Sequence, residues 1–235
     1  MNNECFNIVV PFYDEVENFK VFITIIESLK LDKEVFILLD NGSSNDEMKN
    51  HAQTFKNGSG WKYVYSDVNL GYGGGIIYGA KFCENDYVAW MPGNLKVSPD
   101  SVYRLLQNID IPEENFILKA HRKKRLFGDF IKTKIFGIIV SFTFGTYLYD
   151  AGGTPNLISK SFFDRSEKYP KDFLFDVFVY YFCKKKKYKI IRPRIAYTER
   201  NNGTSHWQKG ILSEIKLTLK AIKSKKNWDI ITNDG

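Results

Sequence analysis

The first hundred residues alternate short apolar runs with segments of helical spacing. This alternation constrains the fold of the chain more than any other feature of the sequence. Val16–Leu29, for example, places its apolar residues roughly one helical turn apart. Predicted strands lie at Phe6–Pro11, Val35–Asp40, Trp61–Ser66 and Tyr87–Met91, and further predicted helices at Asn45–Phe55 and Gly74–Cys83. This order predicts an α/β fold in which helices cover both faces of a mostly parallel sheet.

Polar or glycine-rich turns follow the four predicted strands. They are Pro11–Glu15, Asp40–Asp46, Asn69–Gly75 and Pro92–Lys96. The carboxyl ends of parallel strands meet at one edge of a sheet, and α/β proteins of this kind bind ligands there. The four turns therefore predict a single binding site.

Beyond residue 115 the pattern changes. A basic stretch from Lys119 to Lys134 leads into a charge-free run, Ile135–Tyr149. A membrane span needs about 20 mostly apolar residues, so this shorter run predicts a buried or interfacial segment. A loop, a helix and a strand are then expected at Asp150–Ser159, Tyr169–Lys187 and Lys189–Tyr197.

The C-terminal part predicts a basic amphipathic helix from Ser205 to Lys226. One stripe of that helix is apolar, and most of its lysines lie elsewhere; the stripe holds Ile211, Ile215, Leu219 and Ile222. No repeat or linker interrupts the chain. The simplest division is a main domain at 1–204 followed by a basic helix and tail at 205–235.

Composition narrows the classes of partner and compartment. With 235 residues and 43% hydrophobic side chains, the chain can build a real core. The net charge of +7 favours an anionic partner, but no nucleic-acid-binding module is recognisable, so we expect phosphates or an anionic membrane surface. The three cysteines and three histidines show no metal-ligand spacing, and no secretory signal begins the sequence. A reduced, cytoplasmic setting is expected.

The glycine cluster GYGGG invites comparison with the GxGxxG turn of dinucleotide-binding enzymes. That fingerprint belongs after the first strand, whereas this cluster follows the third. The position argues against a nicotinamide-dependent enzyme. Two interpretations remain, close backbone packing beside the site or direct contact with an anion.

Five segments, taken in order, resemble the family-2 glycosyltransferases of the GT-A fold, which is Rossmann-like. They read VVPFYDEVENF, LLDNGSSNDE, NLGYGGGIIYGAK, WMPGNLKVSPD and ERNNGTSHW and span roughly residues 6 to 210. The branch they most resemble holds the dolichyl-phosphate mannose synthases and bacterial polyprenyl-phosphate glycosyltransferases. The resemblance implies transfer of a sugar from a nucleoside diphosphate to a polyprenyl phosphate or to a lipid-linked or surface glycan, at the inner face of the membrane.

The resemblance also implies which residues bind the nucleotide sugar. The matching positions are Pro11, Tyr13, Glu15, Asp40, Gly71, Asn94, Arg122, Arg200 and Ser205. A carboxylate such as Asp40 accepts hydrogen bonds from a base or ribose, and an arginine grips a phosphate with two of its nitrogens. Three positions depart from the family's usual residues: Asp14 replaces Asn, Asn41 replaces Asp and His206 replaces Lys.

The largest departure is at the fourth turn. Relatives carry Asp-x-Asp there and bind Mg²⁺ or Mn²⁺, whereas this chain reads Pro92-Gly93-Asn94 and offers at most one neutral ligand, the Asn94 amide. Lys96 is a cation that could replace the metal. Three alternatives stay open: transfer with little or no metal, a metal held by substitute ligands, and loss of catalysis. The last would leave a non-catalytic sugar-nucleotide-binding or membrane-surface protein.

Two acidic residues match the acceptor side of the resembling family. Asp150 begins the loop DAGGTPNLIS, which resembles the family's Asp-x-x-x-Gly segment, and Asp176 resembles the acidic residue at the start of the following helix. Either carboxylate could act as general base toward a hydroxyl acceptor, whereas a phosphate acceptor needs none. The run Lys184–Lys187 is either a solvated helix end or, together with the basic helix, a contact with anionic lipid.

Overall fold

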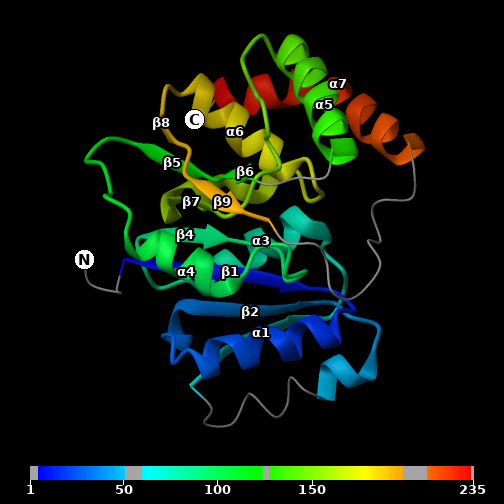
Figure 1. The fold of residues 1–235 in the computed structure, drawn as a ribbon. Coiled ribbons are helices and arrows are strands. Elements are labelled where there is room, and N and C mark those ends of the chain that lie inside the picture. The colour runs from blue at the N-terminus through cyan, green and yellow to red at the C-terminus, as the bar shows by residue number, and fades with distance from the viewer. Residues whose placement is uncertain (1–4, 51–59, 124–126, 198–210, 234–235) are drawn as a thin grey trace.

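The computed structural model describes residues 5–50, 60–123, 127–197 and 211–233 and has a seven-stranded sheet at its centre (Figure 1). The strand order is β3-β2-β1-β4-β7-β5-β8. These strands are β1 Phe6–Phe12, β2 Phe36–Asn41, β3 Lys62–Ser66, β4 Tyr87–Trp90, β5 Phe116–Lys119, β7 Asn156–Ser159 and β8 Lys189–Ile191. Strand β7 is antiparallel to both neighbours and every other pair is parallel, so the predicted mostly parallel α/β sheet is confirmed.

Helices cover both faces of the sheet, and a second small sheet pairs β6 (His121–Lys123) with β9 (Arg194–Ala196). The helices are α1 Val16–Ser28, α3 Gly71–Ala80, α4 Pro99–Gln107, α5 Phe127–Phe144, α6 Phe175–Lys185 and α7 Ile211–Asn233, with short 3-10 turns η1 Lys33–Val35 and η2 Lys160–Lys168. Successive residues of β1 face opposite layers: Ile8 and Val10 pack with α1 and α4, and Val9 packs with α3 and α6. Burial on both faces explains the unbroken apolar run of β1.

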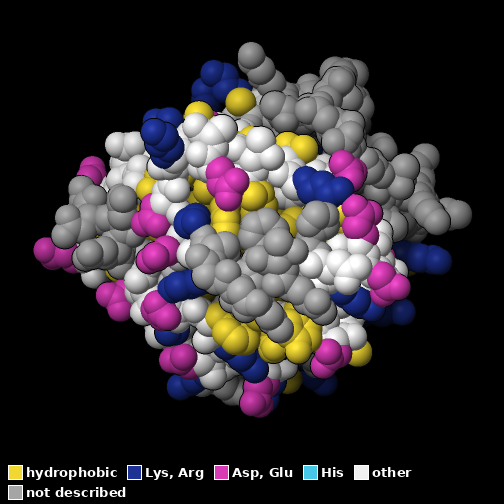
Figure 2. Space-filling model, turned by 90° about the horizontal axis from the view of Figure 1, so that it is seen from below, with side chains coloured by type: hydrophobic (Ala, Val, Ile, Leu, Met, Phe, Trp, Pro, Cys, Tyr) yellow, Lys and Arg dark blue, Asp and Glu magenta, His cyan; other side chains and the backbone are white. Residues whose placement is uncertain are grey.

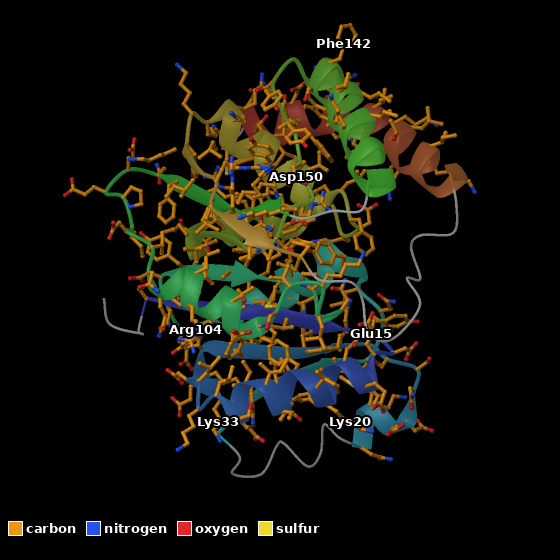
Figure 3. All side chains as sticks on the ribbon, in the orientation of Figure 1. Glu15, Lys20, Lys33, Arg104, Phe142 and Asp150 are labelled. Carbon is orange, nitrogen blue, oxygen red and sulfur yellow. The ribbon has the colours of Figure 1, made fainter. Side chains whose placement is uncertain are left out.

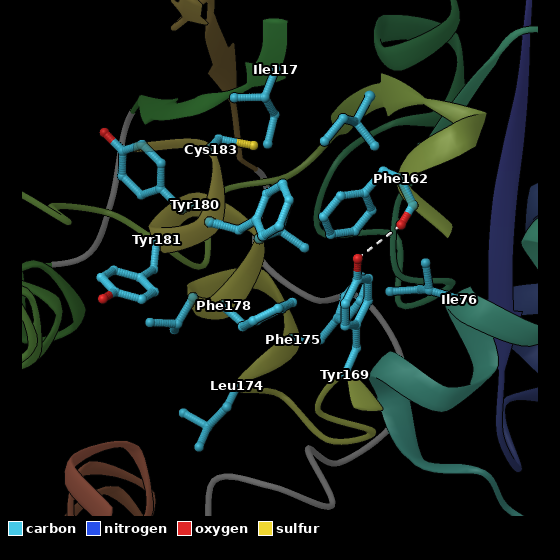
Figure 4. Packing of buried hydrophobic residues seen from close by; sticks show 14 of the residues in the cluster. Ile76, Ile117, Phe162, Tyr169, Leu174, Phe175, Phe178, Tyr180, Tyr181 and Cys183 are labelled. Atoms are coloured by element: carbon cyan, nitrogen blue, oxygen red, sulfur yellow. Dashed lines mark hydrogen bonds between the residues drawn. The ribbon is translucent and has the colours of Figure 1, made fainter. Parts of the chain in front are cut away.

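An aromatic cluster joins α6 to the rest of the fold (Figure 4). The Tyr169 hydroxyl donates a hydrogen bond to the Phe162 carbonyl oxygen at 3.0 Å, and its ring centre lies 4.8 Å from that of Phe178. Trp228 of α7 lies 5.0 Å from Phe144 of α5 and 5.4 Å from Phe178, measured between ring centres. The cluster therefore anchors both α5 and α7 to the sheet layer.

Three predicted elements beyond residue 115 were wrong in extent. The expected helix from Tyr169 begins only at Phe175, because Pro170 interrupts helical geometry and the Lys171 carbonyl accepts a hydrogen bond from Gly74 N at 2.9 Å. The expected strand Lys189–Tyr197 is divided at Pro193 into β8 and β9, which belong to different sheets. The expected loop Asp150–Ser159 contains the buried strand β7.

Other boundaries shift by a few residues or fall outside the description. Residues 46–50 are helical as predicted, and 51–55 lie outside the described residues, as does the boundary between 204 and 205. The expected C-terminal helix is present as α7 but ends at Asn233 instead of Lys226. Within the described part of the chain, no helix has the length and apolar content to cross a membrane.

Candidate active site

The predicted turns lie along one edge of the sheet, because they follow four strands that are neighbours in the order β3-β2-β1-β4. Phe12 at the end of β1 is in register with Asp40 near the end of β2. On the other side of β1, Trp90 ends β4 and is in register with Asn156, the first residue of β7. Strand β4 thus separates the turns of β1 to β3 from a second group of residues on β5, β7 and β8.

The first two turns are joined by Asp14. Its Oδ1 accepts hydrogen bonds from Ser44 N at 2.8 Å and Asn45 N at 3.1 Å, and Ser43 Oγ accepts one from Asp14 N at 3.0 Å. Asp14 has φ = 51°, a left-handed conformation that Asp and Asn adopt more easily than most residues. The substitution of Asp for Asn at this position therefore keeps both the backbone shape and a strong acceptor.

The predicted nucleotide-binding residues of β1 and β2 lie around these turns. Pro11, Tyr13 and Glu15 are half-buried, and Glu15 Oε2 accepts a hydrogen bond from Asn18 Nδ2 at 2.6 Å. Asp40 is 3% exposed, and its Oδ1 accepts a hydrogen bond from Ser43 N at 2.9 Å. These contacts place the side chains at the expected edge, and their role toward a nucleotide stays a prediction.

Close packing explains the glycine cluster. A Cβ at Gly71, where φ is +74°, would lie 2.5 Å from the Lys171 carbonyl oxygen, and one at Gly73 would lie 2.5 Å from that of Pro170. The Asn41 side chain, at the end of β2, forms two hydrogen bonds with this turn. Its Nδ2 donates to the Gly71 carbonyl oxygen at 3.0 Å, and its Oδ1 accepts from Leu70 N at 3.3 Å. The packing interpretation of the cluster is confirmed, and nucleotide contact at Gly71 stays a prediction.

The fourth turn does not fit a divalent metal ion. Its backbone packs on β1, because Gly93 N donates to the Pro11 carbonyl oxygen at 3.2 Å and a Cβ at Gly93 would lie 2.4 Å from the Phe12 ring. The Asn94 Oδ1 atom already accepts a hydrogen bond from Lys96 N at 3.2 Å. Among the residues that the structure describes, no three His, Cys, Asp or Glu side chains are grouped to hold a metal ion.

On the other side of β4, basic side chains surround Asp150, which is 1% exposed. Asp150 Oδ1 accepts a hydrogen bond from Arg122 Nε at 2.6 Å, and Oδ2 accepts one from Arg122 N at 3.0 Å. His121 Nδ1 lies 3.2 Å and an Arg192 nitrogen 4.0 Å from Oδ2. Figure 3 shows Asp150 on the α5 side of the molecule, whereas Glu15 lies at the end of β1.

Asp176 belongs to a buried polar network. It accepts hydrogen bonds from Trp90 Nε1 at 2.9 Å, from the Tyr72 hydroxyl at 3.1 Å and from Asn156 Nδ2 at 3.3 Å. Burial raises the pKa of Asp176, although the nearby Lys119 charge and the hydrogen bonds from Trp90 and Tyr72 act in the opposite direction. Asp176 as a whole is only 5% exposed.

Sequence reasoning missed the role of Lys119, which it counted in a basic stretch. Lys119 is fully buried at the end of β5, and its Nζ donates to Asn156 Oδ1 at 2.8 Å and to the Gly153 carbonyl oxygen at 3.3 Å. Burial lowers the pKa of Lys119 to about 8, against the opposing effect of Asp176. The available signal was the apolar run Phe116–Leu118 directly before this lysine.

The other predicted site residues are only partly placed. Lys96 is half-buried in the fourth turn, and Arg200 and Ser205 lie outside the described residues. In the run Lys184–Lys187, which ends α6, the Lys184 ammonium lies 5.6 Å from the ring centre of Tyr180. A catalytic role for Asp150, Asp176 or Lys96 stays a prediction.

The chain belongs to the family described as Glycosyl transferase family 2, whose model matches residues 7–169, more than half of its length. The sequence resemblance to this family is thereby confirmed. No curated protein matches the chain.

Solved structures show the same fold. Glucosyl-3-phosphoglycerate synthase from Mycobacterium tuberculosis, in complex with phosphoglyceric acid, is 15% identical, with a TM-score of 0.66 over 94% of this chain and 80% of that one. A second structure of that synthase, with Mn²⁺, UDP-glucose and phosphoglyceric acid, is 14% identical, with a TM-score of 0.67 over 94% of this chain and 79% of that one. At such low identity the likeness establishes the GT-A-like α/β fold.

Proposed function

We propose that this protein transfers a sugar from a nucleoside diphosphate to a lipid phosphate at the surface of a membrane. The observation that carries the proposal is the division of the site by β4. Polar turns suited to a nucleotide follow β1 to β3, and arginines suited to a phosphate surround Asp150 on the other side. The M. tuberculosis synthase binds UDP-glucose together with a phosphate-bearing acceptor, which supports the same pairing of ligands here.

The surface of α5 supports an acceptor with an apolar chain. Ile135, Ile138 and Phe142 are 54%, 59% and 90% exposed, and Phe142 points away from the body of the protein in Figure 3. Gly137, on the same helix, packs against Tyr149, the residue before Asp150. An exposed apolar helix therefore lies beside the basic cluster, as a ligand with a phosphate head and a hydrocarbon chain requires.

The helix α7 extends this surface. Its residues Ile215, Leu219 and Ile222 are exposed, whereas Ala221 and Trp228 face the core. Lysines at 216, 223 and 226 are exposed on the same helix. On the opposite side of the molecule, seen from below in Figure 2, basic and acidic side chains are interspersed. We therefore propose that α5 and α7 rest on an anionic membrane, at the cytoplasmic face.

A second candidate function is that of a sugar-nucleotide-binding protein without catalytic activity. The fourth turn favours it, because Pro92, Gly93 and Asn94 carry no charge and the Asn94 amide oxygen is already hydrogen-bonded. Both candidates require a nucleotide site at Asp40. Turnover of a sugar nucleotide in the presence of a lipid phosphate separates them.

Replacing Asp40 with Ala should weaken the binding of UDP by about ten- to a hundredfold, since the loss of a charged acceptor costs about 1–3 kcal/mol. The measurement is the UDP-dependent rise in melting temperature, which depends on affinity for the folded state. Asp46→Ala is the matched control, because Asp46 has a 91% exposed side chain on the same turn. A folded Asp40→Ala protein with an undiminished UDP response would place the nucleotide elsewhere.

Vesicles containing anionic lipid should bind the protein, and added salt should weaken this binding, because it screens the attraction of the lysines. Replacing Ile138 and Phe142 together with Ser should reduce the bound fraction in sedimentation experiments. Val68→Ser is the control, since Val68 is 62% exposed beyond the edge strand β3. Equal binding to neutral vesicles would contradict the electrostatic part of the proposal.

A further inference from the structure

In the described part of the chain, the Asp150 carboxylate is shared by more than one basic side chain. Arg122 bonds to it through Nε and a terminal guanidinium nitrogen, His121 Nδ1 lies 3.2 Å away and Arg192 lies 4.0 Å away. Among the described residues, two guanidinium groups therefore face the Asp150 carboxylate, whose single negative charge balances only one of them. A ligand with negative charge would balance this excess.

Arg192 has unused hydrogen-bonding capacity. One terminal nitrogen donates to the Tyr149 carbonyl oxygen at 3.4 Å, and the guanidinium carbon lies 5.2 Å from the ring centre of Tyr180. The other terminal nitrogen is buried and has no hydrogen-bond partner in the described structure. The side chain as a whole is 23% exposed, so part of it faces solvent. A guanidinium with a buried, unpaired nitrogen on a partly exposed side chain carries a charge that an arriving phosphate would compensate.

The backbone holds Arg192 beside His121. Arg192 occupies the junction between β8, which pairs with β5, and β9, which pairs with β6. His121 N donates to the carbonyl oxygen of Pro193 at 2.7 Å. Strand pairing and this hydrogen bond therefore hold the backbones of Arg192 and His121 next to each other.

We propose that Arg192 and His121 complete, with Arg122, a subsite for the phosphate of the acceptor, and this inference rests on the proposed function. The subsite lies on the β5 and β7 side of the sheet, across β4 from the turns assigned to the nucleotide. Asp150 holds the Arg122 guanidinium in place and leaves Arg192 as the arginine with spare donors. The exposed apolar face of α5 begins beside it, where the chain of a lipid phosphate would lie.

The test compares Arg192→Gln with Arg194→Gln. Arg194 is exposed on β9, two residues away, and is the matched control. The probes are geranyl phosphate, geraniol and inorganic phosphate, with binding measured by calorimetry in the absence of a donor. The wild type should bind both phosphates more tightly than geraniol. Arg192→Gln should weaken both by about tenfold or more, Arg194→Gln should leave them unchanged, and Arg192→Lys should restore part of the affinity.

The response to UDP separates this inference from the proposed function. Arg192→Gln should keep the full UDP-dependent thermal shift, and that shift also shows that the variant is folded. Unchanged binding of geranyl phosphate in this variant would overturn the subsite and leave the donor site standing. If Arg192→Gln lost affinity for UDP and for geranyl phosphate equally, the arginines would belong to the donor site. If the wild type bound geraniol as tightly as geranyl phosphate, the contact would be apolar packing without phosphate recognition. A wild type that binds no nucleoside diphosphate would overturn the proposed function, and with it the acceptor assignment.

Discussion

Replacing Lys119 with Met should lower the free energy of unfolding by about 1–3 kcal/mol, because the Asn156 Oδ1 atom and the Gly153 carbonyl oxygen lose their buried donor. Lys119 is fully buried, and its ammonium and the Asp176 carboxylate share Asn156 as a hydrogen-bonding neighbour. Without the lysine, the Asp176 charge loses its main compensating cation. Denaturation by urea at pH 7 measures the change.

A double substitution makes this prediction sharper. Lys119→Met combined with Asp176→Asn removes both charges, so it should be less destabilising than the sum of the two single changes. Lys123→Met, at an exposed position on β6, is the control and should change stability by no more than about 0.5 kcal/mol. Additive effects of the two buried changes would show that the residues do not interact.

The same lysine predicts a dependence on pH. Its folded-state pKa of about 8 lies below its ordinary value of 10.5, so between these values the unfolded chain binds more protons at this position. The Lys119 contribution should therefore make stability rise as the pH increases from about 8 toward 10, by up to about 2 kcal/mol. Subtracting the profile of Lys119→Met from that of the wild type isolates the effect.

Sugar transfer should survive EDTA, and Lys96→Ala should reduce turnover by about a hundredfold or more, the usual effect of removing a group that stabilises transition-state charge. The reason is that Pro92, Gly93 and Asn94 supply no carboxylate to the fourth turn, and the Asn94 Oδ1 atom already accepts a hydrogen bond from Lys96 N. The departing diphosphate still gains negative charge, and Lys96 is the cation of that turn. Steady-state rates with and without EDTA, and with added Mn²⁺, provide the measurement.

Lys81→Ala is the control for Lys96→Ala, because Lys81 is exposed just beyond the end of α3. Arg200→Ala should also slow transfer, if the arginine implied by the family resemblance grips the diphosphate. Loss of activity in EDTA with recovery in Mn²⁺ would show that the chain binds a metal through ligands outside the fourth turn. Full activity of Lys96→Ala would remove this lysine from the reaction.

The predicted strands of the first hundred residues were found because burial on both faces leaves a local pattern. Each residue of β2, for example, is buried, so the strand reads as one apolar run ending in Asp40 and Asn41. The prediction weakened beyond residue 115, where β7 contributes only four residues and is antiparallel to both neighbours. Such a short strand inside a loop-like segment has no periodicity to detect.

The sequence by itself determined the α/β layering, the edge where the turns gather and the family, because each depends on local patterns and on the order of short motifs. The tertiary structure alone decided which charges meet. Arg192 reaches Asp150 only because β8 pairs with β5, and Lys119 is buried beside Asp176 only because β7 enters between β4 and β5. Contacts between residues so distant in the chain arise from sheet order and packing, which no local pattern in one sequence encodes.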